Sequence, residues 1–346
     1  MSSLCSLPSE LFSLIFGATR GSISDEALQL VCRRFRYHAL DTPSFWVDIC
    51  DEMPSEHISQ RLERCGELQL YLTVSHGLPG RNQQCKCTKW EIIKRHANKF
   101  RSVWIRLMQQ EDGTGDAHYC VKRFAYIHWE SLSELTVDGY GTSTQHFLSL
   151  AISSIFRQAS TPNLKTFCCN DTALLTAIPE TLRGVHVRCT SQSAEVSAIH
   201  ILSLFTLSKN VRRFDLDVRN TQVSYQQSDL VVVDDLSELN VTLHNSLTAP
   251  SIIAYSLKLL KFVGLRHVRV MVDRWTASND VFLSWLSWVG NTSGMLETVE
   301  VCVHTKSSSD HQLCEVLERQ IRNSLDYGTV ITHFPSVSIC FVSDSG

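Results

Sequence analysis

One apolar spacing recurs along the chain and limits the possible folds more than any other feature. In each copy an apolar residue is followed by others three, five and seven positions later, as in Leu182, Val185, Val187 and Cys189. The last three alternate with other residues, which predicts one face of a β-strand. Clear copies begin at Leu132, Leu182, Val211, Leu236, Leu265 and Leu296, and weaker ones at Cys65, Phe100, Leu164 and Phe334. Their mean spacing of roughly 30 residues indicates a chain built from repeated units.

Helical apolar spacing fills the intervals between these strands. The segments are Trp90–Ala97, Phe147–Ile155, Val196–Leu202, Ile253–Leu260, Phe282–Val289 and Leu313–Ile321. A strand followed by a helix in every unit predicts an α/β fold, because parallel strands need a crossover connection. We expect a curved solenoid with the parallel sheet on its concave side and the helices on its convex side. An ordinary α/β domain with alternating elements is the alternative.

The first fifty residues have a different pattern, which predicts three short helices. Leu7, Leu11, Leu14 and Ile15 share one face of the first helix, and Pro8 suits its first turn. The second helix is expected to begin at Ser24 or Asp25, and the third to contain Phe45, Trp46 and Ile49. The apolar stripe of the second helix comprises Leu28, Val31, Cys32, Phe35 and Ala39.

Three segments of this head, in order, resemble an F-box. They are Leu7–Leu11 (Leu-Pro-Ser-Glu-Leu), Val31–Arg36 (Val-Cys-Arg-Arg-Phe-Arg) and Thr42–Trp46 (Thr-Pro-Ser-Phe-Trp). With the irregular units behind it, the chain is similar to fungal F-box proteins that carry divergent leucine-rich repeats. The resemblance implies an F-box over residues 1–50, a joint over 51–64 and a leucine-rich-repeat array over 65–346.

The resemblance also implies a function in a ubiquitin ligase. An F-box of this kind docks on the Skp-type adaptor of a cullin–RING ligase, and the repeats hold a protein substrate. The adaptor contacts it implies are Leu7, Pro8, Leu11, Ile15 and Trp46, with Leu28 and Phe35 shared between core and interface. Two alternatives stay open: a scaffold that binds the adaptor outside a ligase, and a DNA-binding regulator that uses the helix bearing Arg33, Arg34 and Arg36.

Composition narrows the class of protein. With 43% hydrophobic and 19% charged residues, a packed protein is expected, and a net charge of −3 makes a nucleic-acid partner unlikely. No run approaches the ~18 apolar residues of a membrane helix, and no signal peptide is predicted. Thirteen scattered cysteines, including Cys32, Cys65, Cys169 and Cys340 at apolar positions, indicate a reduced cytoplasmic or nuclear protein.

No group of residues predicts catalysis, so an enzyme is not expected. Cys85 and Cys87, in a polar segment interpreted as a loop, lack the spacing of a zinc site, and neither Cys168 nor Cys169 has an evident basic partner. The segment Glu111–Asp116 lacks the ligand spacing of a calcium loop. We therefore expect no metal and no cofactor.

The predicted substrate surface consists of the strand positions between the core positions. It includes Thr136, His186, Asp215, Asn240, Thr242, Met271, Glu300 and Cys302. The substrate-binding candidates among these alternate positions are Trp104, Arg106, Asp138, Arg188, Asp217 and Arg269. Trp104 is the strongest single candidate, because aromatic and arginine side chains dominate interface energetics.

Overall fold

The protein is an α/β structure with one large parallel sheet. The computed structural model describes residues 8, 10–12, 14–15, 33–76, 83–108, 124, 126–140, 161–170, 175, 182–189, 196–218, 223–224, 230–244, 257–272, 283, 285–287, 289, 295–305, 311–326 and 335–343. Among them, no helix is long and apolar enough to cross a membrane. The helices and the parallel sheet confirm the predicted α/β class.

Among the described residues, eleven strands form the sheet, and each strand after the first lies beside the sheet strand that precedes it in the chain. Every neighbouring pair is parallel. The strands are β1 (Asp48–Cys50), β2 (Leu70–His76), β3 (Phe100–Met108), β4 (Glu134–Tyr140), β5 (Thr166–Cys169), β6 (Gly184–Cys189), β8 (Arg213–Val218), β11 (Glu238–Leu243), β13 (His267–Val272), β14 (Thr298–Thr305) and β15 (Ser336–Ser343).

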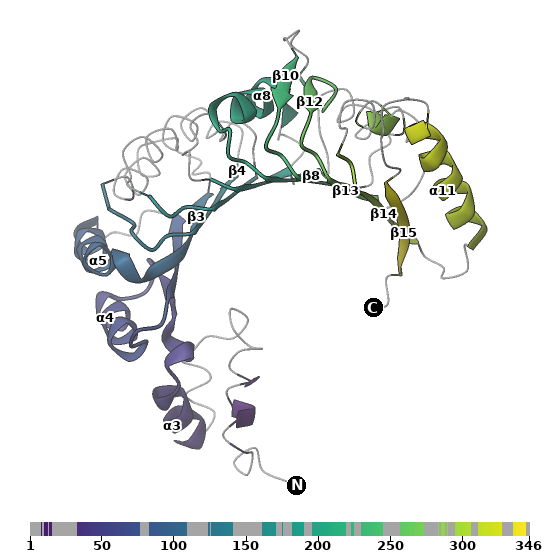
Figure 1. Ribbon diagram of the computed structural model, residues 1–346. Coiled ribbons are helices and arrows are strands. Elements are labelled where there is room, and N and C mark those ends of the chain that lie inside the picture. Colours follow the sequence, from purple (N-terminus) through teal and green to yellow (C-terminus); the bar gives the residue numbers. More distant parts are fainter. Residues whose placement is uncertain are drawn as a thin grey trace.

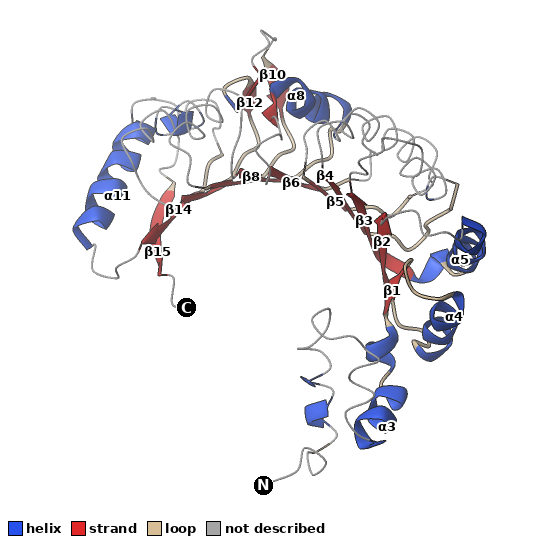
Figure 2. Ribbon diagram, turned by 180° about the vertical axis from the view of Figure 1, so that it is seen from behind, coloured by secondary structure: helices blue, strands red, loops and turns tan. Residues whose placement is uncertain are grey.

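The sheet curves, with its helices on the outer side (Figure 1). These helices are α4 (Ser55–Arg64), α5 (Gln83–Arg95), α8 (Ala198–Leu207) and α11 (His311–Asp326), and the view from behind agrees (Figure 2). The N-terminal helix α3 (Arg33–Asp41) and the 3-10 helix η2 (Pro43–Trp46) lie beyond β1; a second 3-10 helix, η3 (Ala97–Lys99), precedes β3. Two short pairs of parallel strands add to the structure: β7 (Val196–Ser197) with β9 (Val223–Ser224), and β10 (Val231–Val233) with β12 (Leu260–Phe262).

A line of backbone hydrogen bonds fixes the point at which successive strands begin. The Ser133 N–H donates to the Arg101 carbonyl at 2.8 Å, and the Lys165 N–H donates to Ser133 at 2.9 Å. The line continues through Arg183, Arg212, Ser237, Arg266, Glu297 and Ser336. Each donor from Ser133 to Glu297 follows the first apolar residue of the recurring spacing, so the spacing in the sequence corresponds to the register of the sheet.

The core lies between the sheet and the outer helices. The alternating apolar positions of the central strands, such as Val185, Leu216 and Val241, are at most 1% exposed. The rings of Phe205 on α8 and Phe214 on β8 meet edge to face at 5.5 Å, which shows that these positions face the helix layer. The first residues of the clear copies, Leu132, Leu182, Val211, Leu236, Leu265 and Leu296, are also buried, as the spacing predicts.

Several expected element boundaries are wrong. Ile49 lies in β1 and not in a third helix, so the sheet begins inside the segment assigned to the head, and α4 occupies most of the expected joint. Cys85 and Cys87 lie on α5 and not in a loop. Leu260 begins β12, although helical spacing continues to it. The strands β1 and β12 have three residues each, too few for their periodicity to be distinguished.

Other expectations fall outside the described residues. These are the start of the second helix, the helix over Phe147–Ile155 and the loop Glu111–Asp116. The expected helices near Trp90, Val196 and Leu313 correspond to α5, α8 and α11.

Candidate binding surface

The sheet face opposite the helices, here called the open face, carries three registered rows of residues. The first row contains the register partners Arg213 and Glu238, and the other two rows contain the predicted residues. Successive strands place Thr73, Trp104, Thr136, Cys168, His186, Asp215, Asn240, Arg269, Glu300 and Ser338 side by side in the middle row. The last row holds Ser75, Arg106 and Asp138 at one end and Arg188, Asp217, Thr242, Met271, Cys302 and Cys340 at the other. All six predicted substrate-binding residues therefore belong to these rows.

Three of the predicted residues form a cluster near the N-terminal end of the open face. The Trp104 Nε1–H donates to Asp138 Oδ2 at 2.7 Å. The Arg106 guanidinium lies over the Trp104 ring, 3.4 Å from its centroid. The indole is thus held on both its edge and its face. An aromatic ring fixed in this way loses little further rotamer entropy on binding, which suits an anchor for a protein partner.

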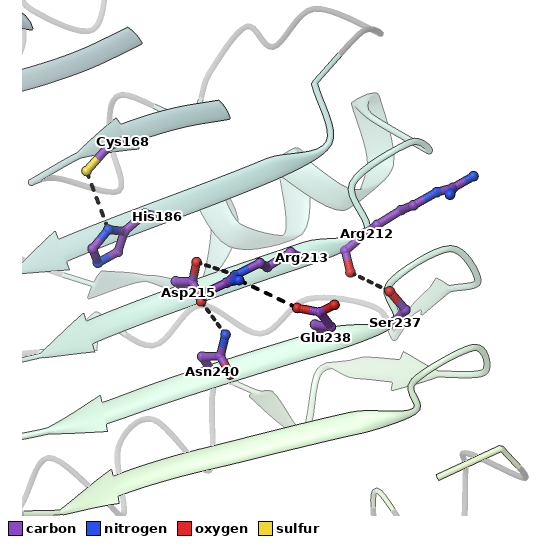
Figure 3. A network of polar contacts seen from close by, with 8 residues as sticks. All are labelled: Cys168, His186, Arg212, Arg213, Asp215, Ser237, Glu238 and Asn240. Carbon is purple, nitrogen blue, oxygen red and sulfur yellow. Dashed lines mark hydrogen bonds and ion pairs between the residues drawn. The ribbon is translucent and has the colours of Figure 1, made fainter. Parts of the chain in front are cut away.

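The centre of the open face is a network of charged and amide groups (Figure 3). Asp215 accepts from Arg213 Nε at 2.9 Å and from the Asn240 amide, and Arg213 lies 3.7 Å from Glu238. The hydrogen bond that Arg213 donates to Asp215 raises the pKa of Arg213. In the last row, Asp217 forms a separate pair, with its Oδ1 2.9 Å from His244 Nε2.

Cys168 has a basic neighbour that its sequence context did not reveal. His186 is its register partner on β6, and Cys168 Sγ is 3.6 Å from His186 Nδ1 (Figure 3). The expectation that no basic residue adjoins this thiol is therefore wrong. Cys169, the next residue, is buried in the core as predicted. Cys168 and His186 are 18 positions apart along the chain, so only the strand register brings them together.

The C-terminal end of the open face joins Arg269 to a sulfur cluster. Arg269 Nε is 3.4 Å from Glu300 Oε2. Cys302 and Cys340, register partners on β14 and β15, form a disulfide. The disulfide departs from the expectation of reduced cysteines. Cys340 was also expected at an apolar core position, which is wrong, because Val337 and Ile339 occupy the core-side positions of β15. Arg188 lies in the last row beside Asp217.

The N-terminal segment exposes part of the predicted adaptor surface. Residues 10–12 and 14–15 are helical; Pro8 and Leu11 are exposed, and Ile15 is half-buried. Leu14 is 67% exposed, whereas Phe12, which was not predicted as a core residue, is fully buried and stacks on His38 at 4.6 Å. Leu7 and Leu28 lie outside the described residues, and Phe35 lies on α3.

Trp46 differs from the other predicted adaptor contacts because it is buried. Its side chain is 3% exposed and its Nε1–H donates to the Ala39 carbonyl at 2.8 Å. The guanidinium of Arg64 lies over its ring at 4.6 Å and that of Arg61 at 5.5 Å. Burial lowers the pKa of Arg61 to about 10. Trp46 therefore ties α3 to α4 and does not form part of an exposed surface.

The fold and this surface define an α/β protein with a curved parallel sheet, one face of which is covered by helices while the other carries rows of polar side chains. No family model and no curated protein matches the chain.

Proposed function

We propose that the protein is a substrate-recognition subunit of a cullin–RING ubiquitin ligase. The observation that carries the proposal is the F-box resemblance of three ordered segments, Leu7–Leu11, Val31–Arg36 and Thr42–Trp46. The head then docks on the Skp-type adaptor and, through it, on cullin and RING subunits in the cytoplasm or nucleus. The exposed apolar side chains of Leu11 and Leu14 support a docking role, because two neighbouring leucines gain from being covered.

The remaining chain is proposed to be an irregular leucine-rich-repeat solenoid. Two features support this: the recurring apolar spacing, and the hydrogen-bond line that joins the same position of successive units. In such an array each unit buries its apolar face against its neighbours. A protein substrate binds the open face, with the cluster of Trp104, Arg106 and Asp138 as its principal anchor.

The proposed protein contributes binding and geometry but no chemical step. Holding a substrate close to the ubiquitin-carrying enzyme turns a bimolecular encounter into a local reaction with a raised effective concentration. The open face supplies mixed charges, which favour selectivity for a complementary protein surface.

Co-purification of the full chain with a Skp-type adaptor tests the proposal. A Leu11→Asp/Leu14→Asp variant changes only exposed head positions. It should weaken adaptor binding roughly thirtyfold or more, which corresponds to a loss of about 2 kcal/mol in the free energy of binding. Leu68→Asp is the matched control, because Leu68 is also an exposed leucine, at 42%, but lies outside the head. It should bind like the native chain.

The outcome separates the proposed role from its alternatives. Recovery of cullin with the adaptor supports the ligase receptor, while adaptor without cullin supports a scaffold. A native chain that is folded by circular dichroism but captures no adaptor would overturn the proposal.

A further inference from the structure

Three sulfur-bearing residues lie side by side at the C-terminal end of the open face. Met271 on β13 is the register partner of Cys302 on β14, which is the partner of Cys340 on β15. The Cα atoms of the two cysteines are 4.7 Å apart. Three parallel strands hold these positions, so the sulfur atoms are kept close whether or not the cysteines are bonded to each other.

A carboxylate completes the cluster. Glu300 Oε1 is 3.5 Å from Cys302 Sγ and 3.9 Å from Cys340 Sγ, and one ligand atom from each of these three residues lies within 4.8 Å of the other two. A tetrahedral zinc ion with Zn–S bonds of about 2.3 Å requires its ligand atoms to be about 3.8 Å apart. The two distances from Glu300 Oε1 to the sulfur atoms are of that size. The two sulfur atoms are bonded to each other, so they reach such a separation only after the disulfide is reduced.

A cationic side chain, that of Arg269, lies beside the cluster. Its Nε is 3.4 Å from Glu300 Oε2, and one of its terminal nitrogens is 3.8 Å from Cys302 Sγ. Two thiolates and a carboxylate carry three negative charges, which a divalent cation and one guanidinium balance. Arg269 is therefore placed as an outer-shell partner of the ligands, a role that orients and tunes them in metal sites.

We infer that Cys302, Cys340 and Glu300 bind a thiophilic divalent cation of the zinc class once the disulfide is reduced. Reduction by a thiol or phosphine adds two electrons and two protons to the disulfide and gives two thiols. The cation then forms a bond to each sulfur, and the two thiol protons leave to solvent. Thiolate sulfur selects such ions over magnesium or calcium, which prefer oxygen ligands.

The site joins the last two strands of the sheet. Its ligands come from β14 and β15, so the bound ion replaces the disulfide as a cross-link between these strands. The disulfide and the metal site are alternative states of one pair of cysteines, and the redox state of the protein decides which of them forms.

Cadmium titration of the reduced full-length protein tests the inference, because cadmium thiolates absorb in the ultraviolet. The chain is reduced with a phosphine, freed of excess reductant without oxygen, and titrated with Cd²⁺, followed by displacement with Zn²⁺. We expect each chain to bind one Cd²⁺ ion tightly. Cys302→Ser should weaken binding more than the roughly 10–100-fold loss typical of an outer-shell change, and Glu300→Gln should weaken it while keeping the thiolate band.

The other cysteines are controlled in two ways. Cys168→Ser removes a thiol of the open face outside the cluster, so it should keep the tightly bound Cd²⁺ ion. In the native chain, bound Zn²⁺ should protect Cys302 and Cys340 from alkylation, as mapped by mass spectrometry, and this readout needs no variant. A reduced, folded native chain without a tightly bound Cd²⁺ ion, or equal losses in Cys302→Ser and Cys168→Ser, would overturn the inference.

Discussion

The two faces of the sheet are built from alternate residues of the same strands, yet they carry different information. On β8 the ring of Phe214 packs against Phe205 in the core, while its neighbour Asp215 lies in a polar network. The helix-facing positions are restricted to buried apolar side chains, because any gap or unpaired polar group there is destabilising. The open-face positions have no such restriction, so their side chains differ from strand to strand and form contacts within the face.

The largest expected change in stability comes from comparing the two faces at adjacent residues of β8. Phe214→Ala removes a fully buried ring and should lower the free energy of unfolding by about 3–5 kcal/mol. Asp215→Ala is the matched control on the same strand and should have a smaller effect, about 1–2 kcal/mol, because it removes partly exposed hydrogen bonds. Urea denaturation followed by circular dichroism measures both. Equal losses would show that the polar network contributes as much stability as the core.

Much of the helix-facing side was predictable from the sequence, since burial requires apolar residues at period two in the strands. The clear copies at Leu182, Val211 and Leu236 gave the positions and order of their strands. The three-residue strands β1, β10 and β12 were missed, because three residues are too few to show alternation. Their pairing is decided by tertiary contacts.

The sequence predicted which residues lie on the open face, but not which of their side chains contact each other. The six substrate-binding candidates were identified because they alternate with core residues. Which side chains meet depends on strand register, as for Cys168 with His186 and Cys302 with Cys340. The register was available in principle: Met271 and Cys302 both stand six residues after the start of a copy, at Leu265 and Leu296. Trp46 was misassigned because a motif residue can be a core residue, and its burial depends on α4.

Two glycines, one on a turn and one in a strand of the open face, give the second test. A Cβ at Gly264, on the turn between β12 and β13, would overlap the backbone oxygen of Asp234, so Gly264→Ala forces two backbone segments apart. We expect a loss of about 1–3 kcal/mol in the free energy of unfolding.

Gly184→Ala is the control for this substitution. Gly184 lies at the start of β6 on the open face, and the nearest atom to its added Cβ is 3.8 Å away. Because that is an ordinary contact, alanine should leave stability unchanged or raise it by about 0.4–1 kcal/mol through the unfolded chain. Thermal and urea unfolding of both variants give the comparison. A Gly264→Ala protein as stable as the native chain would mean that the turn beside β12 relaxes freely.

The smallest effect concerns contacts within the open face. The hydrogen bond from Trp104 to Asp138 should give a coupling energy of about 1 kcal/mol in a double-mutant cycle of Trp104→Phe and Asp138→Ala. Phenylalanine keeps a ring beneath Arg106 while removing the donor, so the cycle isolates the hydrogen bond from the stacking. Additive losses would mean that Asp138 does not hold the indole. If coupling is present but each single variant changes the free energy of unfolding by no more than about 0.5 kcal/mol, as surface substitutions usually do, the contact orders the Trp104 side chain more than it stabilises the fold. A residue kept in place at so little gain in stability is what a binding surface requires, and a helix-facing residue would not behave in this way.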